Sequence, residues 1–473
     1  MNFQTAPTIE RTTYDRDATA IGIVHLGYGA FHRAHQAVYV DQYMEETGDL
    51  AWGIAAVNLR GSEAENFRAA QDAKDGYLLK TTSPEDDVQY QLVRAHVRFE
   101  DWSQDQQQAE ALLSLESVHA VTITVTEAGY CLDDNWALNV DDPALRAELE
   151  GGAPQTVYAY LANALAKRAE AGGKPISVLC CDNIRSNGKM LCKNFTAYLR
   201  LRGLTDLENW ISENATFPCS MVDRITPRTT DALLAEIDAA FAGRTLAPIH
   251  GERFIQWVIQ ENFAGPMPDL AKCGVEVVED VDPYEEAKIR ILNGGHTGLC
   301  YLGALAGHQT FDQAMRDPKL RAHFDNWEQK NVLPGLKIEL PFDRAEYLGL
   351  IAARFSNRAI ADDLARICMD GWSKMPIFVR PTLEGCLSEG IDPVYGYDVI
   401  ASWYVYARRH QAGANDIPYV DAYWDALEPL LEKGREEEFA QSQSLWGTLP
   451  VTYDNFAPGI VAAIKKMEEQ WPK

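Results

Sequence analysis

The sequence has few features of an exported, membrane-spanning or metal-bound protein. Its 473 residues contain no apolar run approaching the roughly eighteen that cross a bilayer, and the charged residues 1–20 lack the apolar core of a signal peptide. The nine cysteines are scattered with no CxxC pair, so we expect reduced thiols and no structural zinc site. These absences predict a cytoplasmic protein with no membrane partner and no metal.

Basic residues are also scarce. The chain has 43 Lys and Arg against 69 Asp and Glu, a formal net charge of −26, which disfavours nucleic acid and anionic membranes as partners. No internal repeat, low-complexity tract or long flexible linker is visible. The length predicts two or three domains, and 46% apolar residues are enough to build full cores.

Apolar runs alternate with helical segments in the first part of the chain. Helices are expected at 33–46 and 156–171. Strand-like runs occupy residues 21–26, 52–59, 118–126 and 175–181. This alternation predicts an α/β fold with a doubly wound, Rossmann-like and mostly parallel sheet, whose ligands gather at the carboxyl ends of the strands.

After about Pro283 the pattern becomes helical, as in 285–307, 362–372 and 419–442. We place a boundary near 280–285. The chain is expected to divide into a dinucleotide-binding domain, residues 1–284, and a helical substrate and catalytic domain, residues 285–473. Residues 440–473 look helical, and no function is assigned to them.

A glycine turn follows the first strand. Gly27 and Gly29 lie where a dinucleotide fold needs a sharp turn and a close approach of backbone to pyrophosphate. The third glycine position of GxGxxG holds His32, so the fingerprint is incomplete, and a tight turn without a ligand is the alternative. We expect the cofactor to contact the segment Gly27, Tyr28, Gly29, Ala30, Phe31, His32 and Arg33.

The end of the second strand bears on the choice of cofactor. Glu63 can bind the adenosine ribose, whereas Arg60 can meet a 2′-phosphate. NAD is therefore favoured over NADP.

The segment YEEAKIRILNGGH, residues 284–296, carries several chemically useful side chains on one helix. With each residue advancing about 100°, His296, Asn293 and Glu285 fall at roughly 80°, 140° and 60° from Lys288. All four share a face, while Arg290 points elsewhere and Ile289, Ile291 and Leu292 can pack toward a core.

Such a face suits the oxidation of a secondary alcohol, which must lose its hydroxyl proton as hydride leaves carbon. Lys288 can take the proton if its pKa is lowered from about 10.4 by burial or cationic neighbours. Asn293 can donate to the developing alkoxide, His296 can orient a hydroxyl, and Glu285 can relay protons to solvent. The alternative is a solvated face on which Glu285 pairs one turn later.

Seven motifs in one order carry a family resemblance. The sequence resembles the polyol-specific long-chain dehydrogenases, the mannitol dehydrogenase family. The motifs are HLGYGAFHRAHQ (25–36), TVTEAGY (124–130), CDNIRSNG (181–188), MVDRITP (221–227), FIQWVIQENF (254–263), KIRILNGGH (288–296) and RICMDGWSK (366–374).

The resemblance implies a zinc-free mechanism with Lys288 as general base. It assigns Asn183 and Asn293 to the alkoxide, His296 to substrate orientation and Glu285 to proton relay. It also implies that Thr126 contacts the cofactor and that Asp223, Arg366 and Lys374 bind substrate. Arg366 and Lys374 lie eight apart, so both can share a helical face with Asp370. The alternative for them is a surface Arg366–Asp370 ion pair and a solvated Lys374.

The substrate is less defined than the class. PYEEAKIRILN, GERFIQWVIQENF and DGYLLKTTSPE look most like arabinitol-oxidising members, so we expect D-arabinitol or D-mannitol to be oxidised to D-xylulose or D-fructose. A hexuronate reductase acting on fructuronate or tagaturonate is one alternative, because Arg366 or Lys374 can hold a carboxylate. A non-catalytic sugar-binding protein is another, disfavoured because Lys288, Asn293 and His296 are all present. Trp372 stands where a small residue is frequent, and a monomer is expected.

Overall fold

The computed structural model describes residues 7–73, 75–133, 135–241, 244 and 246–471. They form two compact units: the first ends at Asp282 and the second begins at Pro283, with the short segment Ser83–Asp86 counted to the second. The apolar cores of the two units are built from separate sets of residues.

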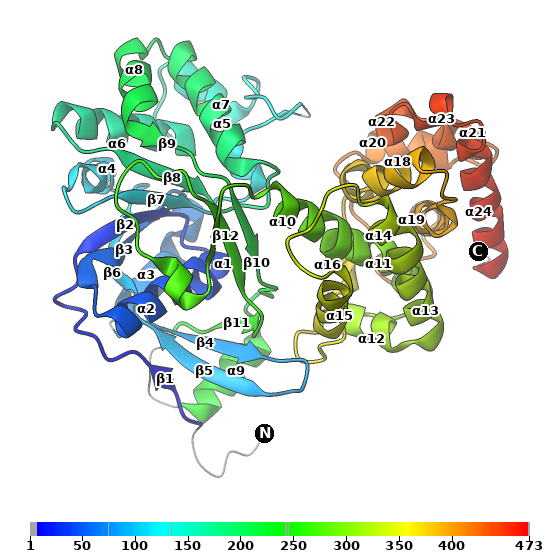
Figure 1. The fold of residues 1–473 in the computed structure, drawn as a ribbon, viewed down its shortest axis with the longest axis horizontal. Coiled ribbons are helices and arrows are strands. Elements are labelled where there is room, and N and C mark those ends of the chain that lie inside the picture. The colour runs from blue at the N-terminus through cyan, green and yellow to red at the C-terminus, as the bar shows by residue number, and fades with distance from the viewer. Residues whose placement is uncertain (1–6, 74, 134, 242–243, 245, 472–473) are drawn as a thin grey trace. The chain divides into compact units, whose positions relative to one another are not determined.

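A six-stranded parallel sheet forms the centre of the first unit (Figure 1). Its strands lie in the order β6 (His96–Asp101), β3 (Gly53–Asn58), β2 (Ile21–Leu26), β7 (Ala120–Ile123), β8 (Ile176–Cys180) and β9 (Ala215–Thr216). When these six strands are numbered by their order in the chain, their order across the sheet is 3-2-1-4-5-6. This is the arrangement of dinucleotide-binding doubly wound sheets, so the predicted fold class is confirmed.

Both faces of this sheet are covered, which explains why its strands are apolar without alternation. Val24 and Leu26 of β2 point into one core, and Ile23 points into the other. The first core includes α4 (Gln106–Ala111), α6 (Val157–Glu170), α7 (Asn187–Leu201) and α8 (Thr205–Asn214), and the second includes α1 (Ala30–Ala34) and α2 (Gln36–Thr47).

The helix expected at 33–46 is divided at His35. α1 ends at Ala34 and α2 begins at Gln36, because His35 leaves helical geometry. Its Nε2 donates to the carbonyl oxygen of Gln256 at 2.8 Å. A bond to a residue so distant in the sequence overrides the local helical pattern.

Two smaller sheets complete the first unit. One has the order β1 (Glu10–Arg11), β5 (Val88–Val93), β4 (Tyr77–Thr82), β11 (Ile249–Glu252), and the other β10 (Ser220–Asp223), β12 (Gln256–Gln260), β13 (Glu276–Val278). Its remaining helices are η1 (Leu50–Trp52), η2 (Gly61–Glu63), α3 (Ala64–Asp72), η3 (Leu112–Ser114), η4 (Glu127–Tyr130), α5 (Pro143–Leu149), α9 (Asp231–Ala240) and η5 (Leu270–Cys273).

The second unit is helical (Figure 1). Its central helix α19 (Val394–Gln411) is buried from Gly396 to Arg408 and packs against α11 (Gly294–Leu305), α13 (Pro318–Trp327) and α24 (Phe456–Gln470). Its helices are α10 (Asp282–Ala287), η6 (Lys288–Asn293), α11 (Gly294–Leu305), α12 (Phe311–Arg316), α13 (Pro318–Trp327), η7 (Glu328–Val332), α14 (Leu333–Gly335), α15 (Arg344–Phe355), α16 (Leu364–Ile367), α17 (Gly371–Lys374), η8 (Met375–Val379), α18 (Arg380–Ser388), α19, α20 (Trp424–Leu427), η9 (Glu428–Leu431), α21 (Glu436–Ala440), α22 (Gln443–Trp446), α23 (Leu449–Thr452) and α24 (Phe456–Gln470).

Two of the expected helices in this unit are wrong in extent. Residues 362–372 are broken at Asp370, which has a left-handed φ of 56° and donates its N–H to the Val420 carbonyl at 2.9 Å. Residues 419–442 form only the short helices α20, η9 and α21. Residues 419–423 are not helical, and Gly434, with a φ of 93°, lies in the break between η9 and α21.

Within the described residues, every helix is too short or too polar to span a lipid bilayer.

Candidate active site

The first strand of the central sheet ends in a turn that only glycine can form at its first position. Gly27 has a φ of 95°, and its N–H donates to the Val57 carbonyl at 3.0 Å. A Cβ on Gly27 would lie 2.0 Å from the carbonyl oxygen of Thr124. Leu26 pairs with Ile123 here, between the two strands where the order of the sheet reverses, which is where ligands bind in such folds.

Gly29 differs from Gly27. It precedes α1 with an ordinary φ of −76°, and a Cβ on it would have open space around it. The backbone can therefore be approached closely on this side. An open glycine at the switch point fits the pyrophosphate of a dinucleotide.

The other side chains of the turn are engaged with the protein. Tyr28 packs edge-on against Phe67 and Phe99, and Arg33 lies 5.2 Å from the centre of the Tyr28 ring. Phe31 stacks on His35, and His32 is fully buried. The side chain of His32 therefore supports the turn from beneath, and the backbone is left for a ligand.

A half-buried carboxylate, that of Asp182, holds the loop after β7, where Thr126 has a left-handed φ of 64°. Asp182 accepts hydrogen bonds from the backbone of Val125 (2.9 Å) and Thr126 (3.1 Å) and from the Tyr130 hydroxyl (2.8 Å). Burial raises its pKa to about 6, although these bonds oppose the shift. Sequence reasoning missed Asp182, although it stands in the CDNIRSNG motif directly before Asn183. Asn183 is exposed.

Arg60 and Glu63, which the sequence predicts to select the cofactor, lie just after β3, the second strand of the central sheet in chain order. Glu63 is exposed in η2. The Asn58 amide donates to the Arg60 carbonyl at 2.9 Å, and the Arg60 guanidinium lies beside Gly129. A carboxylate and a guanidinium thus both lie near the carboxyl edge of the sheet.

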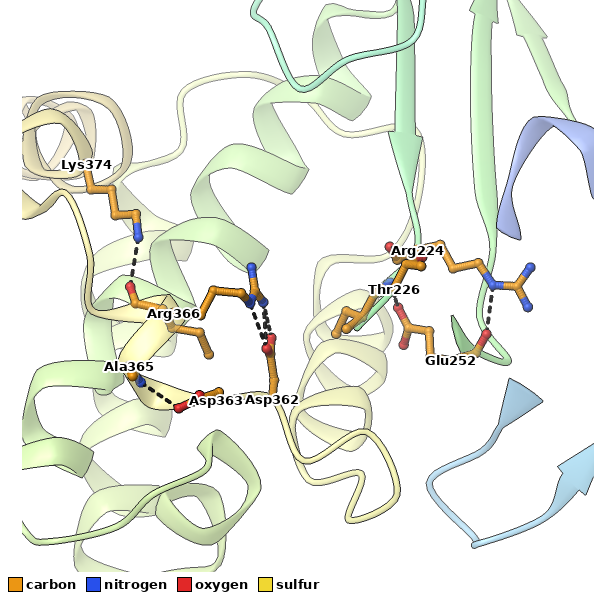
Figure 2. Close-up of polar contacts among 10 residues, drawn as sticks. Arg224, Thr226, Glu252, Asp362, Asp363, Ala365, Arg366 and Lys374 are labelled. Atoms are coloured by element: carbon orange, nitrogen blue, oxygen red, sulfur yellow. Dashed lines mark hydrogen bonds and ion pairs between the residues drawn. The ribbon is translucent and has the colours of Figure 1, made fainter. Parts of the chain in front are cut away.

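Asp223 ends β10 and is buried. The next residue, Arg224, donates through Nε to the Glu252 carbonyl at 2.8 Å (Figure 2). Its Nη1 donates to the Ala34 carbonyl at the end of α1. The Glu252 carboxylate accepts the N–H of Ile225 at 2.6 Å. Burial lowers the pKa of Arg224 to about 10. These bonds fix the chain that carries Asp223, and sequence reasoning did not identify Arg224 or Glu252.

The predicted lysine helix has a π turn at its centre. The N–H of Gly294 donates to the carbonyl of Ile289, five residues earlier. Because a π turn aligns residues five apart, Lys288 and Asn293 lie closer together around the axis than a straight α-helix predicts. Single π turns of this kind are frequent at functional sites.

This helix is held on its other side by Arg290. Its guanidinium pairs with Glu286 (2.8 Å) and donates to the Thr382 hydroxyl (2.9 Å) and the Gly335 carbonyl (3.2 Å). Lys288 and Glu285 are both buried, and neither is without an interaction partner, so they are not the solvated face of the alternative interpretation.

His296 lies one helical turn later, between aromatic rings and cations. Its imidazole stacks on Phe355 with 4.0 Å between centroids and meets the edge of Phe311. Burial, followed by the charges of Arg366, Arg354 and Lys374, lowers the pKa of His296 well below its usual value. A neutral imidazole results, which can both donate and accept a hydrogen bond.

Arg366 and Lys374 do not share one helix, which corrects the sequence-based expectation. Arg366 binds Asp362 one turn earlier, not Asp370, with Nε–Oδ1 and Nη2–Oδ1 distances of 3.0 and 2.6 Å (Figure 2). Lys374, on α17, donates to the Ile367 carbonyl at 2.8 Å, and burial lowers its pKa. The left-handed Asp370 separates α16 from α17, so the two cations come from different helical segments. Trp372 packs partly buried on the core of this unit.

Among the described residues, no group of three or more His, Cys, Asp or Glu side chains is placed to hold a metal ion. The cysteines are free thiols.

A parallel sheet with an open glycine turn at its switch point, together with a π-turn helix that carries a buried lysine, defines an α/β oxidoreductase. Residues 21–272 match the mannitol dehydrogenase Rossmann domain, and residues 280–467 match the mannitol dehydrogenase C-terminal domain. The chain therefore belongs to the mannitol dehydrogenase family of oxidoreductases.

Similar proteins support this assignment. A D-arabinitol 4-dehydrogenase of Ralstonia nicotianae is 36% identical, covering 91% of this chain and 93% of that protein. A polyol:NADP oxidoreductase of Gluconobacter oxydans is 38% identical, covering 80% and 78%. Mannitol 2-dehydrogenase of Pseudomonas fluorescens, solved in a ternary complex with NAD and D-mannitol, is 30% identical with a TM-score of 0.86, covering 99% and 96%. Polyol dehydrogenation is the activity that this family membership supports.

Proposed function

We propose that this chain is an NAD-dependent polyol dehydrogenase that needs no metal. It oxidises a secondary alcohol of D-arabinitol or D-mannitol to D-xylulose or D-fructose, with Lys288 as general base. The observation that carries this proposal is the π turn that brings Asn293 toward the face of the buried Lys288, with His296 one turn later.

The glycine turn and its neighbours are assigned to the cofactor. When NAD is bound, the backbone from Gly27 to Arg33 would hold the pyrophosphate, Thr126 would contact the cofactor, and Glu63 would bind the ribose hydroxyls. NAD, when bound, supplies the acceptor for the hydride that leaves the substrate carbon. The exposed Glu63 favours NAD over NADP, because a carboxylate repels a 2′-phosphate. Arg60 is the residue through which NADP would be accommodated.

The protein side chains manage the proton and the oxygen charge. Lys288 Nζ takes the hydroxyl proton, which requires the amine in its neutral form. The amide groups of Asn293 and Asn183 donate to the oxygen as it becomes an alkoxide. Glu285, three residues before Lys288 on the same helical face, passes the proton toward solvent. His296, held neutral, orients a neighbouring hydroxyl.

Two of the cations near His296 are already engaged with protein groups, which supports a neutral substrate over a uronate. The Arg366 guanidinium already shares its charge with Asp362, and Lys374 donates to a backbone carbonyl. An added carboxylate would compete with Asp362 for Arg366. Arg366 and Lys374 are thus better suited to donating hydrogen bonds to hydroxyls, and Asp223 to accepting from them.

The test measures reduced nicotinamide after mixing the protein with NAD, EDTA and one donor at a time: D-arabinitol, D-mannitol, D-sorbitol or D-mannonate. We expect turnover of arabinitol or mannitol that the chelator does not affect. Lys288→Ala should lower kcat by about 10²–10⁴-fold, because the general base is lost. Lys465→Ala, which changes an exposed lysine of α24, is the matched control and should leave kcat unchanged.

Other results would redirect the assignment. Turnover of D-mannonate alone would favour a uronate reductase. Turnover only with NADP would mean that Arg60, binding the 2′-phosphate, selects the cofactor in place of Glu63. No turnover with any donor and either cofactor would contradict the proposed enzymatic activity and favour a non-catalytic sugar-binding protein. A monomeric, cytoplasmic protein completes the proposal, and light scattering of the purified chain tests the first part.

A further inference from the structure

Three buried histidines lie directly beneath the glycine turn, in a chain that has only ten. His25 and His32 stack with ring centroids 3.3 Å apart and planes within 9°. His32 Nε2 lies 2.9 Å from His96 Nε2. All three rings are almost fully removed from solvent. We call His25, His32 and His96 the histidine stack.

The neighbours of the stack determine where its protons lie. His25 Nε2 faces the Gly27 carbonyl at 2.8 Å, so it carries hydrogen, and Nδ1 accepts from the Thr122 hydroxyl at 2.8 Å. His32 Nδ1 faces Gln36 Oε1 at 3.3 Å, so it donates there and Nε2 accepts from His96 Nε2–H. His96 Nδ1 is then bare, in agreement with its lack of a hydrogen-bond partner among the described residues.

All three rings are neutral in this arrangement. Burial lowers the pKa of His25 to about 3 and holds the pKa values of His32 and His96 well below the usual value. The Arg16 guanidinium, bonded to the His96 carbonyl, and Arg33, over the Tyr28 ring, oppose protonation further. A neutral, fully directed set of hydrogen bonds is rigid.

The stack acts on the glycine turn through one atom. The Gly27 carbonyl oxygen accepts from His25 Nε2 (2.8 Å), the Thr124 hydroxyl (3.1 Å) and the Gly29 N–H (3.0 Å). The Gly27 N–H donates to the Val57 carbonyl. The left-handed peptide of Gly27 is therefore fixed on both sides, and His25 supplies one bond that depends on the position of its ring.

We propose that the histidine stack positions the glycine turn for the dinucleotide, and that His32 replaces the third glycine of the fingerprint for this reason. The third glycine normally allows close packing of helix and strand. Here a flat ring achieves the same packing by stacking on His25 and bonding to His96. This inference rests on the proposed function, since it assigns the turn to a dinucleotide.

A counterintuitive substitution gives the sharpest test. His32→Gly restores the standard GxGxxG pattern, so a motif-based interpretation predicts unchanged or tighter NAD binding. The proposed role of the histidine stack predicts instead that His32→Gly raises the Kd for NAD, measured by calorimetry on the full chain, by about tenfold or more. The KM for the polyol should change little. His96→Gln keeps a donor toward His32 Nε2 and should bind NAD like wild type, whereas His96→Leu should resemble His32→Gly.

Hydrogen exchange of the protein without nucleotide gives an independent measurement. Amides of residues 26–34 should exchange faster in His32→Gly and His96→Leu than in wild type and His96→Gln. If His32→Gly does not fold, the comparison of His96→Gln with His96→Leu decides whether the histidine stack positions the turn. Equal NAD affinity and equal exchange in all variants would contradict the proposed positioning role of the histidine stack. Failure of wild type to bind NAD or NADP would overturn the proposed function instead, and the exchange experiment would still judge the stack.

Discussion

Gly27 and Gly29 are two residues apart and serve different purposes. Gly27 combines a left-handed φ with a contact that leaves no space for a Cβ, whereas Gly29 has an ordinary φ and open space. The first glycine is thus required by the protein itself, and the second by the proposed ligand. At the residue scale, stability and binding are therefore separable within one turn.

Alanine at each position should separate these two roles. Gly27→Ala should lower the melting temperature and abolish NAD binding, because its Cβ would overlap the Thr124 carbonyl. Gly29→Ala should keep the melting temperature and raise the Kd for NAD by about tenfold or more, since its methyl group projects where the ligand approaches. Thermal unfolding and calorimetric titration measure both quantities. Equal NAD binding by Gly29→Ala and wild type would show that the ligand does not approach the turn from this side.

At the scale of elements, loops at the carboxyl edge of the sheet are held by side chains from neighbouring strands. Asp182, which follows β8, binds the backbone of the loop after β7, where Thr126 has a left-handed φ. A backbone in such a conformation persists only when its surroundings fix it. The carboxylate must be ionised to accept all three of its hydrogen bonds, which makes this loop sensitive to pH.

The affinity for NAD should fall as the pH drops through about 6. Burial raises the pKa of Asp182 from its ordinary value to about 6, so the carboxylate is ionised above this pH and protonated below it. Protonation removes an acceptor from the Thr126 loop. The hydrogen bond from Tyr130 lowers the pKa of Asp182, so Tyr130→Phe should move the loss of affinity to higher pH.

Titration of the Kd for NAD between about pH 5 and 8 checks this prediction within the range where carboxyl groups with raised pKa values ionise. Tyr160→Phe is the matched control, because the Tyr160 hydroxyl donates to the Ala109 carbonyl and not to Asp182. An affinity that stays flat through pH 6, or the same midpoint in wild type and Tyr130→Phe, would contradict the role of Asp182.

At the scale of the whole molecule, charge is the dominant feature. The net charge of −26 is distributed over two units whose cores are separate, so each unit folds against the repulsion of an acidic surface. Such self-repulsion destabilises the compact state and is weakened by salt. Local cations, such as Arg366 and Lys374, are exceptions to the net sign.

Added salt should therefore stabilise the protein at neutral pH. Between about 0.01 and 0.15 M NaCl the screening length falls from about 30 Å to about 8 Å, and we expect the melting temperature to rise by a few degrees. Near the isoelectric point of about 4.8 the net charge disappears, so the same addition should have little effect at pH 5. An equal rise at pH 5 and pH 7.5 would mean that salt acts by some means other than screening net charge.

Much of the fold follows from local patterns in the sequence. The strands at 21–26, 52–59 and 175–181 are found within one residue of their ends, because a strand buried on both faces is a continuous apolar run. The helix at 156–171 is equally clear, since Thr156 caps it and alanines fill it. The segment around Lys288 was recognisable as a helix, but its π turn was not, because no residue type specifies one.

The sequence by itself determined the alternation of strand and helix, the family, the glycine turn and the lysine on its helix, because each is a property of neighbouring residues. Only the tertiary structure decided the breaks at His35 and Asp370, the Arg366–Asp362 pair in place of Arg366–Asp370, the Asp182 bonds and the histidine stack. His25 and Thr122 are 97 residues apart, and His32 and His96 are 64 apart. Bonds over such separations depend on the order of strands in the sheet, which no local pattern specifies.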